Sequence, residues 1–139
     1  MKKKQFTILA LVLVVVVVVA ALILSRNRPY KPTSFVADGD NWSATSIDGS
    51  SVLLELNNDN NSEAWSIASE PDTFVSDYHN ILENIAEFHI IALNDGQGEM
   101  VFQCTKDDGS TVRYILALSI SRHQKTNLQI DSISFTECT

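Results

Sequence analysis

The chain has 139 residues, a formal net charge of −7 and two cysteines. Residues 35–139 hold all seventeen carboxylates but only four of the ten lysines and arginines, which gives them a formal net charge of −13. Proteins bind nucleic acids mainly by neutralising phosphates with lysine and arginine, so this acidity excludes a nucleic-acid-binding role. Residues 35–139 are enough for one small domain with a single core, and too few for two.

The first predicted element is a transmembrane helix over residues 6–24, after a short basic N-terminus at residues 1–5. These nineteen positions carry no charge and one hydroxyl, that of Thr7. A helix of this length reaches about 28 Å, close to the thickness of a bilayer's hydrocarbon layer. We interpret the segment as an uncleaved signal anchor, because its apolar run exceeds the ~7 to 15 residues of a signal peptide. A cleaved signal is the alternative.

The charges around this segment leave its orientation nearly balanced, because basic residues flank both ends. The chain begins only a few residues before the apolar run and all carboxylates follow it, which favours the N-terminus inside. We therefore expect a single-pass protein of the cell membrane with an extracytoplasmic C-terminal domain. Residues 25–34 contain Pro29 and Pro32 and are expected to form a stalk.

The remaining residues, 35–139, are predicted to fold as an all-β domain. Short segments of alternating hydrophobicity, separated by turn residues, favour an immunoglobulin-like antiparallel β-sandwich of about seven strands. The hydrophobic phase changes within the last strand, so we expect a bulge near Asp131 and Ser132. Apolar residues at helical spacing after Ser76 predict one short helix there. The expected strands are 41–47, 51–56, one around Trp65, 88–93, 99–105, 111–121 and 127–138.

The two cysteines, Cys104 and Cys138, both lie in this domain. In an exported chain an isolated pair of cysteines indicates a disulfide, which would close a loop of roughly 35 residues and stabilise the fold by ~3 to 4 kcal/mol. The three histidines show no ligand spacing with the cysteines, and zinc prefers four ligands. We expect no metal site and no cofactor.

The order of several segments resembles the chagasin family of cysteine-protease inhibitors. The similar features are the turn and strand over residues 47–56, the tryptophan Trp65 after a polar loop, the Gly96-Gln97-Gly98 segment, and a long strand that ends at Arg122. The resemblance covers residues 47–123 and implies a small immunoglobulin-like sandwich. In that family, three loops at one end of the sandwich form a wedge that enters the active-site cleft of a protease.

The resemblance implies partner-binding loops at residues 57–63, 94–99 and 122–125. Of the family's Asn-Pro-Thr-Thr-Gly motif only Asn58 is kept, and of its Arg-Pro-Trp motif only Arg122. A glutamate, Glu99, stands where the second loop of the family has a further glycine. The predicted contact residues are Asn58, Asp59, Asn60, Asn61, Gly96, Gln97, Gly98, Arg122 and His123.

The sequence gives no indication of an enzyme. It contains no Gly-x-Ser-x-Gly nucleophile elbow, and its adjacent carboxylates Asp107 and Asp108 are typical of a solvated turn. Polar loops on a rigid β scaffold are common binding sites. We therefore expect a membrane-anchored domain that binds a protein, either as a chagasin-like inhibitor of a papain-like cysteine protease or as a structural or adhesive module of a cell-envelope or membrane complex.

Overall fold

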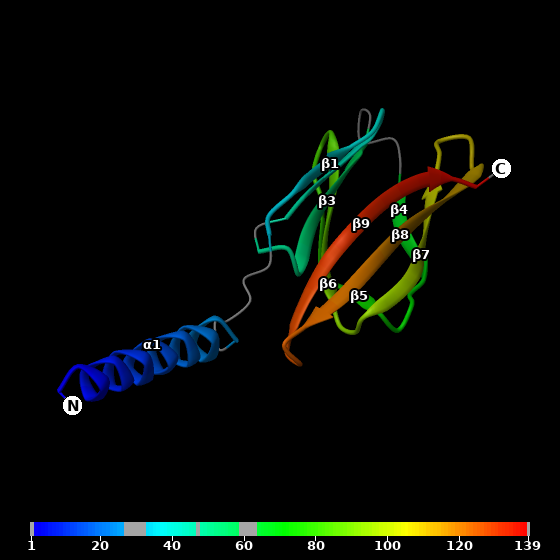
Figure 1. Cartoon of the computed structure of the whole chain (residues 1–139). Coiled ribbons are helices and arrows are strands. Elements are labelled where there is room, and N and C mark those ends of the chain that lie inside the picture. Colours follow the sequence, from blue (N-terminus) through cyan, green and yellow to red (C-terminus); the bar gives the residue numbers. More distant parts are fainter. Residues whose placement is uncertain (1, 27–32, 47, 59–63, 139) are drawn as a thin grey trace. The chain divides into compact units, whose positions relative to one another are not determined.

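The computed structural model describes residues 2–26, 33–46, 48–58 and 64–138 (Figure 1). The chain forms two compact units, Met1–Tyr30 and Lys31–Thr139. The first unit contains one helix, α1 (Lys2–Arg26), whose described side chains, those of residues 7–23, are all exposed. Among the described residues, no helix combines the length and the apolar character that a membrane span requires.

The second unit consists of two antiparallel sheets, so the expectation of an all-β sandwich domain is met at this level. The five-stranded sheet has the order β1-β2-β3-β6-β5, and the four-stranded sheet has the order β4-β7-β8-β9. The strands are β1 (Val36–Asp38), β2 (Trp42–Thr45), β3 (Ser51–Asn57), β4 (Ala64–Ser69), β5 (Phe74–Ile81), β6 (Ile85–Ala92), β7 (Gly96–Thr105), β8 (Thr111–His123) and β9 (Asn127–Glu137).

The core lies between the two sheets and follows from the alternation in the sequence. Along β3 and β6 every second side chain is buried, because successive residues of a strand point to opposite faces. The buried ring of Phe88 on β6 meets that of Phe102 on β7 edge-on, with centroids 4.9 Å apart and planes at 82°. Phe102 also meets Phe135 of β9 at 5.7 Å and 74°. The first contact joins the two sheets across the interior, and the second joins two strands of the four-stranded sheet.

The expected bulge in the last strand is confirmed. Ser132 pairs with Ser119 of β8, whereas Ile130 pairs with the next residue of β8, Ile120, so Asp131 is the extra residue. In a regular strand, residues five positions apart point to opposite faces. The bulge shifts the register, so Ile130 and Phe135 both point into the core.

The prediction of a short helix after Ser76 is wrong, because this segment forms the hairpin of β5 and β6. Its apolar residues are not the buried stripe of a helix: Tyr78 and Ile81 are exposed on an edge strand. A second bulge, at Asp77, shifts the register between Ser76 and Tyr78 and so breaks the two-residue period. Because of the bulge and the following turn, the apolar residues of this segment recur at the three- to four-residue spacing of a helix.

The predicted disulfide is also wrong, because Cys104 and Cys138 are both thiols. Cys104 is buried on β7, whereas Cys138 follows β9 and is exposed. The backbone of Cys138 bonds to Arg113 of β8, which itself pairs with Gln103 of β7. A whole strand therefore separates the cysteines, which places them about 9.5 Å apart, beyond the ~7 Å limit for a disulfide.

Candidate functional site

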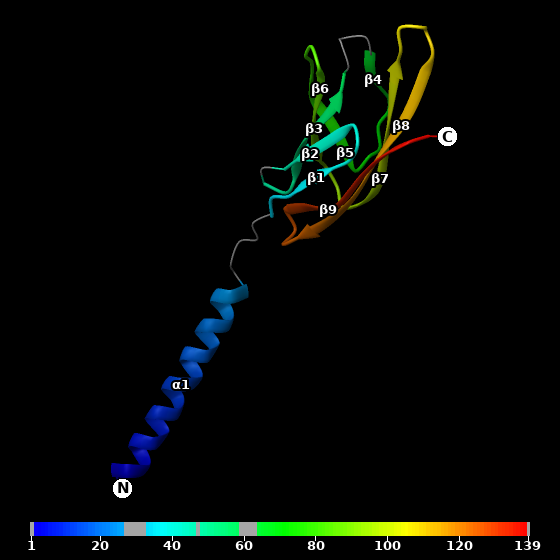
Figure 2. The same ribbon diagram turned by 90° about the horizontal axis from the view of Figure 1, so that it is seen from above.

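The pairing of the strands assigns each turn to one of two ends of the domain, and Figures 1 and 2 show these as opposite ends of the sandwich. At the first end, β3 leaves the sheet at Asn57, and the β7–β8 turn follows Thr105. We call this the pocket end. At the other end, the β6–β7 turn precedes Gly96 and the β8–β9 turn follows His123. We call this the tether end.

The name of the tether end reflects where the chain enters the domain. The backbone amide of Thr33 donates to Oε1 of Gln129 over 2.7 Å, and Gln129 lies on β9 just after the β8–β9 turn. The backbone amide of Ser46 donates to the carbonyl of Phe35 over 2.9 Å. Thr33, the first described residue of the domain, therefore lies at the end opposite to the pocket end.

The predicted contact residues Gly96, Gln97 and Gly98 lie at the tether end, and Gly98 has a packing role there. A Cβ at position 98 would overlap Oγ1 of Thr73 and would lie 3.1 Å from Cβ of Pro71. Glycine thus permits the close approach of β7 to the segment that precedes β5. Gln97 and Gly98 also line a hollow of about 550 Å³ on the four-stranded sheet, together with residues of β8 and β9.

Arg122 lies at the tether end as well, where it holds the β8–β9 turn. Its Nη1 donates to the carbonyl of Lys125 over 2.8 Å, and its Nε donates to Asp95 Oδ1 over 3.3 Å. Gln124 and Lys125 have φ values of 50° and 63°, a conformation that costs energy for residues other than glycine. The guanidinium therefore stabilises a strained turn and connects it to the β6–β7 turn.

His123 forms a small polar group with Ser121 and Asp131. The Ser121 hydroxyl donates to Asp131 Oδ1 over 3.1 Å and lies 3.1 Å from Nε2 of His123. In a catalytic triad the carboxylate bonds to the histidine, which in turn accepts the proton of the serine. Here the carboxylate accepts the hydrogen bond of the serine hydroxyl directly, so the order of contacts differs from that of a triad.

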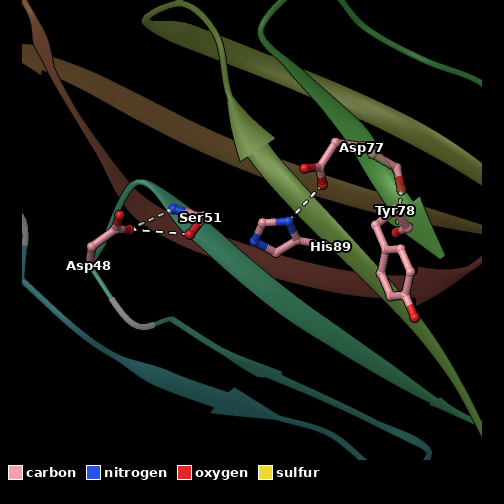
Figure 3. A network of polar contacts seen from close by, with 6 residues as sticks. Asp48, Ser51, Asp77, Tyr78 and His89 are labelled. Atoms are coloured by element: carbon pink, nitrogen blue, oxygen red, sulfur yellow. Dashed lines mark hydrogen bonds and ion pairs between the residues drawn. The ribbon is translucent and has the colours of Figure 1, made fainter. Parts of the chain in front are cut away.

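A second histidine–carboxylate contact lies on the five-stranded sheet (Figure 3). Nδ1 of His89 on β6 is 2.6 Å from Oδ1 of Asp77, the bulged residue of β5. Both side chains are substantially exposed, at 36% and 44%. In the described part of the chain, no serine or cysteine bonds to the other ring nitrogen of His89. The contact is a surface pair that joins two strands, and such pairs contribute little to stability.

Figure 3 also shows Asp48, which organises the turn before β3. Burial alone would raise the pKa of Asp48, but hydrogen bonds from the backbone and hydroxyls of Ser50 and Ser51 outweigh it and hold the pKa below its ordinary value. A carboxylate that accepts bonds from its own turn is a structural feature. The turn before β3, with which the chagasin resemblance begins, is thus stabilised by hydrogen bonds among its own residues.

The pocket end holds one described member of the predicted contact set, Asn58. Its side chain is fully buried, and its Nδ2 donates to the carbonyl of Leu82 over 3.1 Å. Its backbone amide donates to the carbonyl of Asn84 over 2.8 Å. The predicted contact residues Asp59, Asn60 and Asn61 lie outside the described residues. Asn58 thus fastens the end of β3 to the β5–β6 turn.

The structure does not gather the predicted loops at one end. Asn58 belongs to the pocket end, whereas Gly96 to Gly98, Arg122 and His123 belong to the tether end. The β5–β6 turn bonds to Asn58, and the β7–β8 turn lies at the same end of the domain. The described members of the predicted contact set therefore lie at two ends of the domain.

The pocket end contains a hollow that the sequence did not reveal. Its volume is about 500 Å³, within the range of small-ligand sites. We call it the aromatic pocket, and its lining combines aromatic rings with charged and amide groups from both sheets. The lining residues are Gly39, Asp40, Asn41, Trp42, Asn57, Trp65, Lys106, Tyr114, Phe135 and Glu137.

The aromatic walls of this pocket are fixed by contacts with the core. Phe135 is nearly buried, and its ring stacks on Tyr114 with centroids 5.1 Å apart and planes at 3°. Trp65 lies 5.1 Å from Tyr114, and its indole nitrogen donates to the carbonyl of Asn57 over 3.2 Å. Trp42 lies 6.0 Å from Phe135. The rings are thus held in place before any ligand arrives.

Gly39 is the position that lets Trp42 form this wall. A Cβ at residue 39 would overlap the indole nitrogen of Trp42, so the ring lies directly on the glycine backbone. The same short turn is closed by a hydrogen bond of 2.9 Å from the amide of Gly39 to the carbonyl of Trp42. One sequence signal for this site was present: both tryptophans of the chain, Trp42 and Trp65, stand beside polar loop segments.

No cluster of metal-ligating side chains occurs among the residues that the structure describes. Comparison with known proteins gives no match to a protein-family model, to a curated protein or to a solved structure.

We predict that Gly98 acts through packing. The variant Gly98→Ala should lose about 1 to 3 kcal/mol of unfolding free energy, because the new methyl group overlaps Thr73. Guanidinium unfolding of the full chain in mild detergent, followed by tryptophan fluorescence, measures this loss. The control is Gly109→Asn, since that glycine has φ 83° and no atom within 4 Å of an added Cβ; asparagine tolerates such a φ. A Gly98→Ala protein as stable as the control would contradict the packing role.

Proposed function

We propose that residues 35–139 form an extracytoplasmic, immunoglobulin-like domain that binds a partner protein through its pocket end and is held at the cell membrane by residues 6–24. The observation that carries the proposal is the position of the aromatic pocket. It lies between rigid sheets, at the end opposite to the point where Thr33 joins the domain. A partner bound at this end leaves uncovered the end of the domain that contains Thr33.

The strand order supports the immunoglobulin-like part of the proposal. The strands β2-β3-β6-β5 correspond to the four-stranded sheet of that fold, and β4-β7-β8 correspond to its three-stranded sheet. The additional strands β1 and β9 extend one edge of each sheet. In immunoglobulin variable domains, loops at one end of the sandwich are the binding site.

The membrane part of the proposal rests on the sequence. The run of nineteen uncharged residues from Phe6 to Leu24 lies within the helix α1 (Lys2–Arg26). Basic residues flank this run, and the acidic domain follows it. An uncharged run of this length is typical of a membrane anchor, and translocation of the acidic domain that follows it is part of the proposal.

A chagasin-like inhibitor is one specific form of this binding function. Such an inhibitor would have to use the pocket end, because Asn58, the β5–β6 turn that bonds to it and the β7–β8 turn all belong to that end. The glycines and Arg122 of the resemblance would then have structural roles at the tether end. A module of a membrane complex would use the same end against a different partner.

We predict that Cys138 reports the side of the membrane on which the domain lies. A charged maleimide that does not cross the plasma membrane should modify the full chain in intact cells, because Cys138 is exposed on the domain. The variant Cys138→Ser should remain unmodified until denaturation, since Cys104 is buried. Labelling detected by mass only after lysis would place the domain inside and contradict the proposal.

Photo-cross-linking tests the binding end directly. A photoreactive amino acid at position 107, in the β7–β8 turn, should form a discrete adduct with a partner in cells that produce the full chain. The same amino acid at position 124, in the β8–β9 turn, is the matched control and should form none. Adducts from position 124 alone, or from neither position, would contradict the proposal. Titrating a papain-like protease with the full chain then separates an inhibitor, which lowers turnover, from a module of a complex.

A further inference from the structure

The aromatic pocket has a chemical character that narrows what it can hold. Its walls are the half-buried rings of Trp42, Trp65 and Tyr114, with the nearly buried ring of Phe135 behind them. Each indole and phenol ring carries partial negative charge on its face. A cation placed over such a face is attracted to it, more strongly when it is desolvated, and tryptophan is the strongest of these partners.

The charged groups around the pocket favour the same kind of ligand. Two carboxylates, Asp40 and Glu137, belong to the lining, and the lining has one cation, Lys106. The formal charge of the lining is therefore −1. The turn that contains Lys106 carries two further carboxylates, Asp107 and Asp108.

The charge of the domain as a whole strengthens this preference. Residues 35–139 carry a formal net charge of −13, so an anionic ligand would be repelled during its approach and a cationic one would be attracted. Complementary charge of this kind mainly raises the rate of association and suppresses wrong partners. Aromatic walls with carboxylates at the rim therefore suit a side chain with a long apolar stem and a cationic head.

We propose that the aromatic pocket binds an arginine or lysine side chain of the partner protein, and arginine most readily because its planar guanidinium both stacks on aromatic rings and pairs with carboxylates. This proposal rests on the protein-binding function proposed above and specifies its chemistry. In this proposal the cationic head contacts the rings of Trp42 and Trp65 that line the pocket, and Asp40 and Glu137 accept its hydrogen bonds. The partner therefore presents a basic segment to the pocket end.

The chain offers a direct readout of this pocket. Trp42 and Trp65 are its only two tryptophans, and both line the pocket, so all tryptophan fluorescence of the protein comes from the proposed site. The probe is a short glycine-serine peptide with one arginine, and its control has citrulline in the same position. Citrulline keeps the length and planarity of arginine and lacks its charge.

Titration of the full chain in mild detergent should show a saturable change of tryptophan fluorescence with the arginine peptide. The citrulline peptide should bind about tenfold more weakly, which is the loss expected for one desolvated cation–π contact with its ion pair. The double variant Asp40→Asn, Glu137→Gln should weaken the arginine peptide by a similar factor and leave the citrulline peptide unchanged. Asp95→Asn, at the tether end, is the matched control and should change neither.

Equal binding of the two peptides, or a fluorescence response to neutral saccharides alone, would overturn the proposal. So would the absence of any response to the arginine peptide. The failure of this proposal is distinguishable from the failure of the proposed function. An adduct from position 107 without arginine binding would retain a partner at this end and reject the cationic anchor. Arginine binding without an adduct would retain the pocket chemistry and reject the protein-binding function in those cells.

Discussion

Phe102 lies between the two sheets, where its ring meets Phe88 of the five-stranded sheet and Phe135 of its own sheet. Such edge-to-face pairs contribute about 0.5 to 1.5 kcal/mol beyond the burial of their area. Phe135 in turn contacts Trp42, Trp65 and Tyr114. A continuous series of rings therefore runs from the centre of the core to the wall of the pocket. The geometry of the candidate site depends on this series, because the same contacts that close the sandwich also fix the pocket walls.

This arrangement divides the domain into ends with different roles. At the tether end the special residues are explained by structure: Gly98 permits a close approach, Arg122 holds a strained turn, and Asp48 caps the turn before β3. At the pocket end the aromatic rings, the carboxylates and the polar turns surround a hollow of about 500 Å³. The binding function proposed for the domain rests on this hollow, and the formal charge of −13 on residues 35–139 favours a basic partner in that proposal.

Much of the fold was predictable because strand periodicity is a local property. The alternation over 51–56, 99–105 and 111–121 predicted β3, β7 and β8, and the phase change in the last strand predicted the bulge at Asp131. The segment after Ser76 was not predictable in this way. The bulge at Asp77 and the exposure of Tyr78 and Ile81 on an edge strand produced helical spacing without a helix. Similarly, the disulfide prediction was wrong because the spacing of cysteines along the chain does not show how many strands lie between them.

The site was less predictable than the fold, because it is assembled from residues of both sheets. Trp42, Trp65 and Phe135 come from β2, β4 and β9, and nothing in their separation along the chain brings them together. The resemblance to a loop-based inhibitor directed attention to Gly96 and Arg122, which strand register places at the other end.

Nuclear Overhauser effects between aromatic rings test most directly whether the core fixes the pocket walls. They are measured in solution on the full chain with labelled phenylalanine and tryptophan. We expect contacts from the Phe102 ring to those of Phe88 and Phe135, and from the Phe135 ring to the indoles of Trp42 and Trp65. A spectrum in which Phe102 contacts Phe88 while the Phe135 ring contacts neither indole would contradict this expectation, because the pocket walls would then not be fixed by the core.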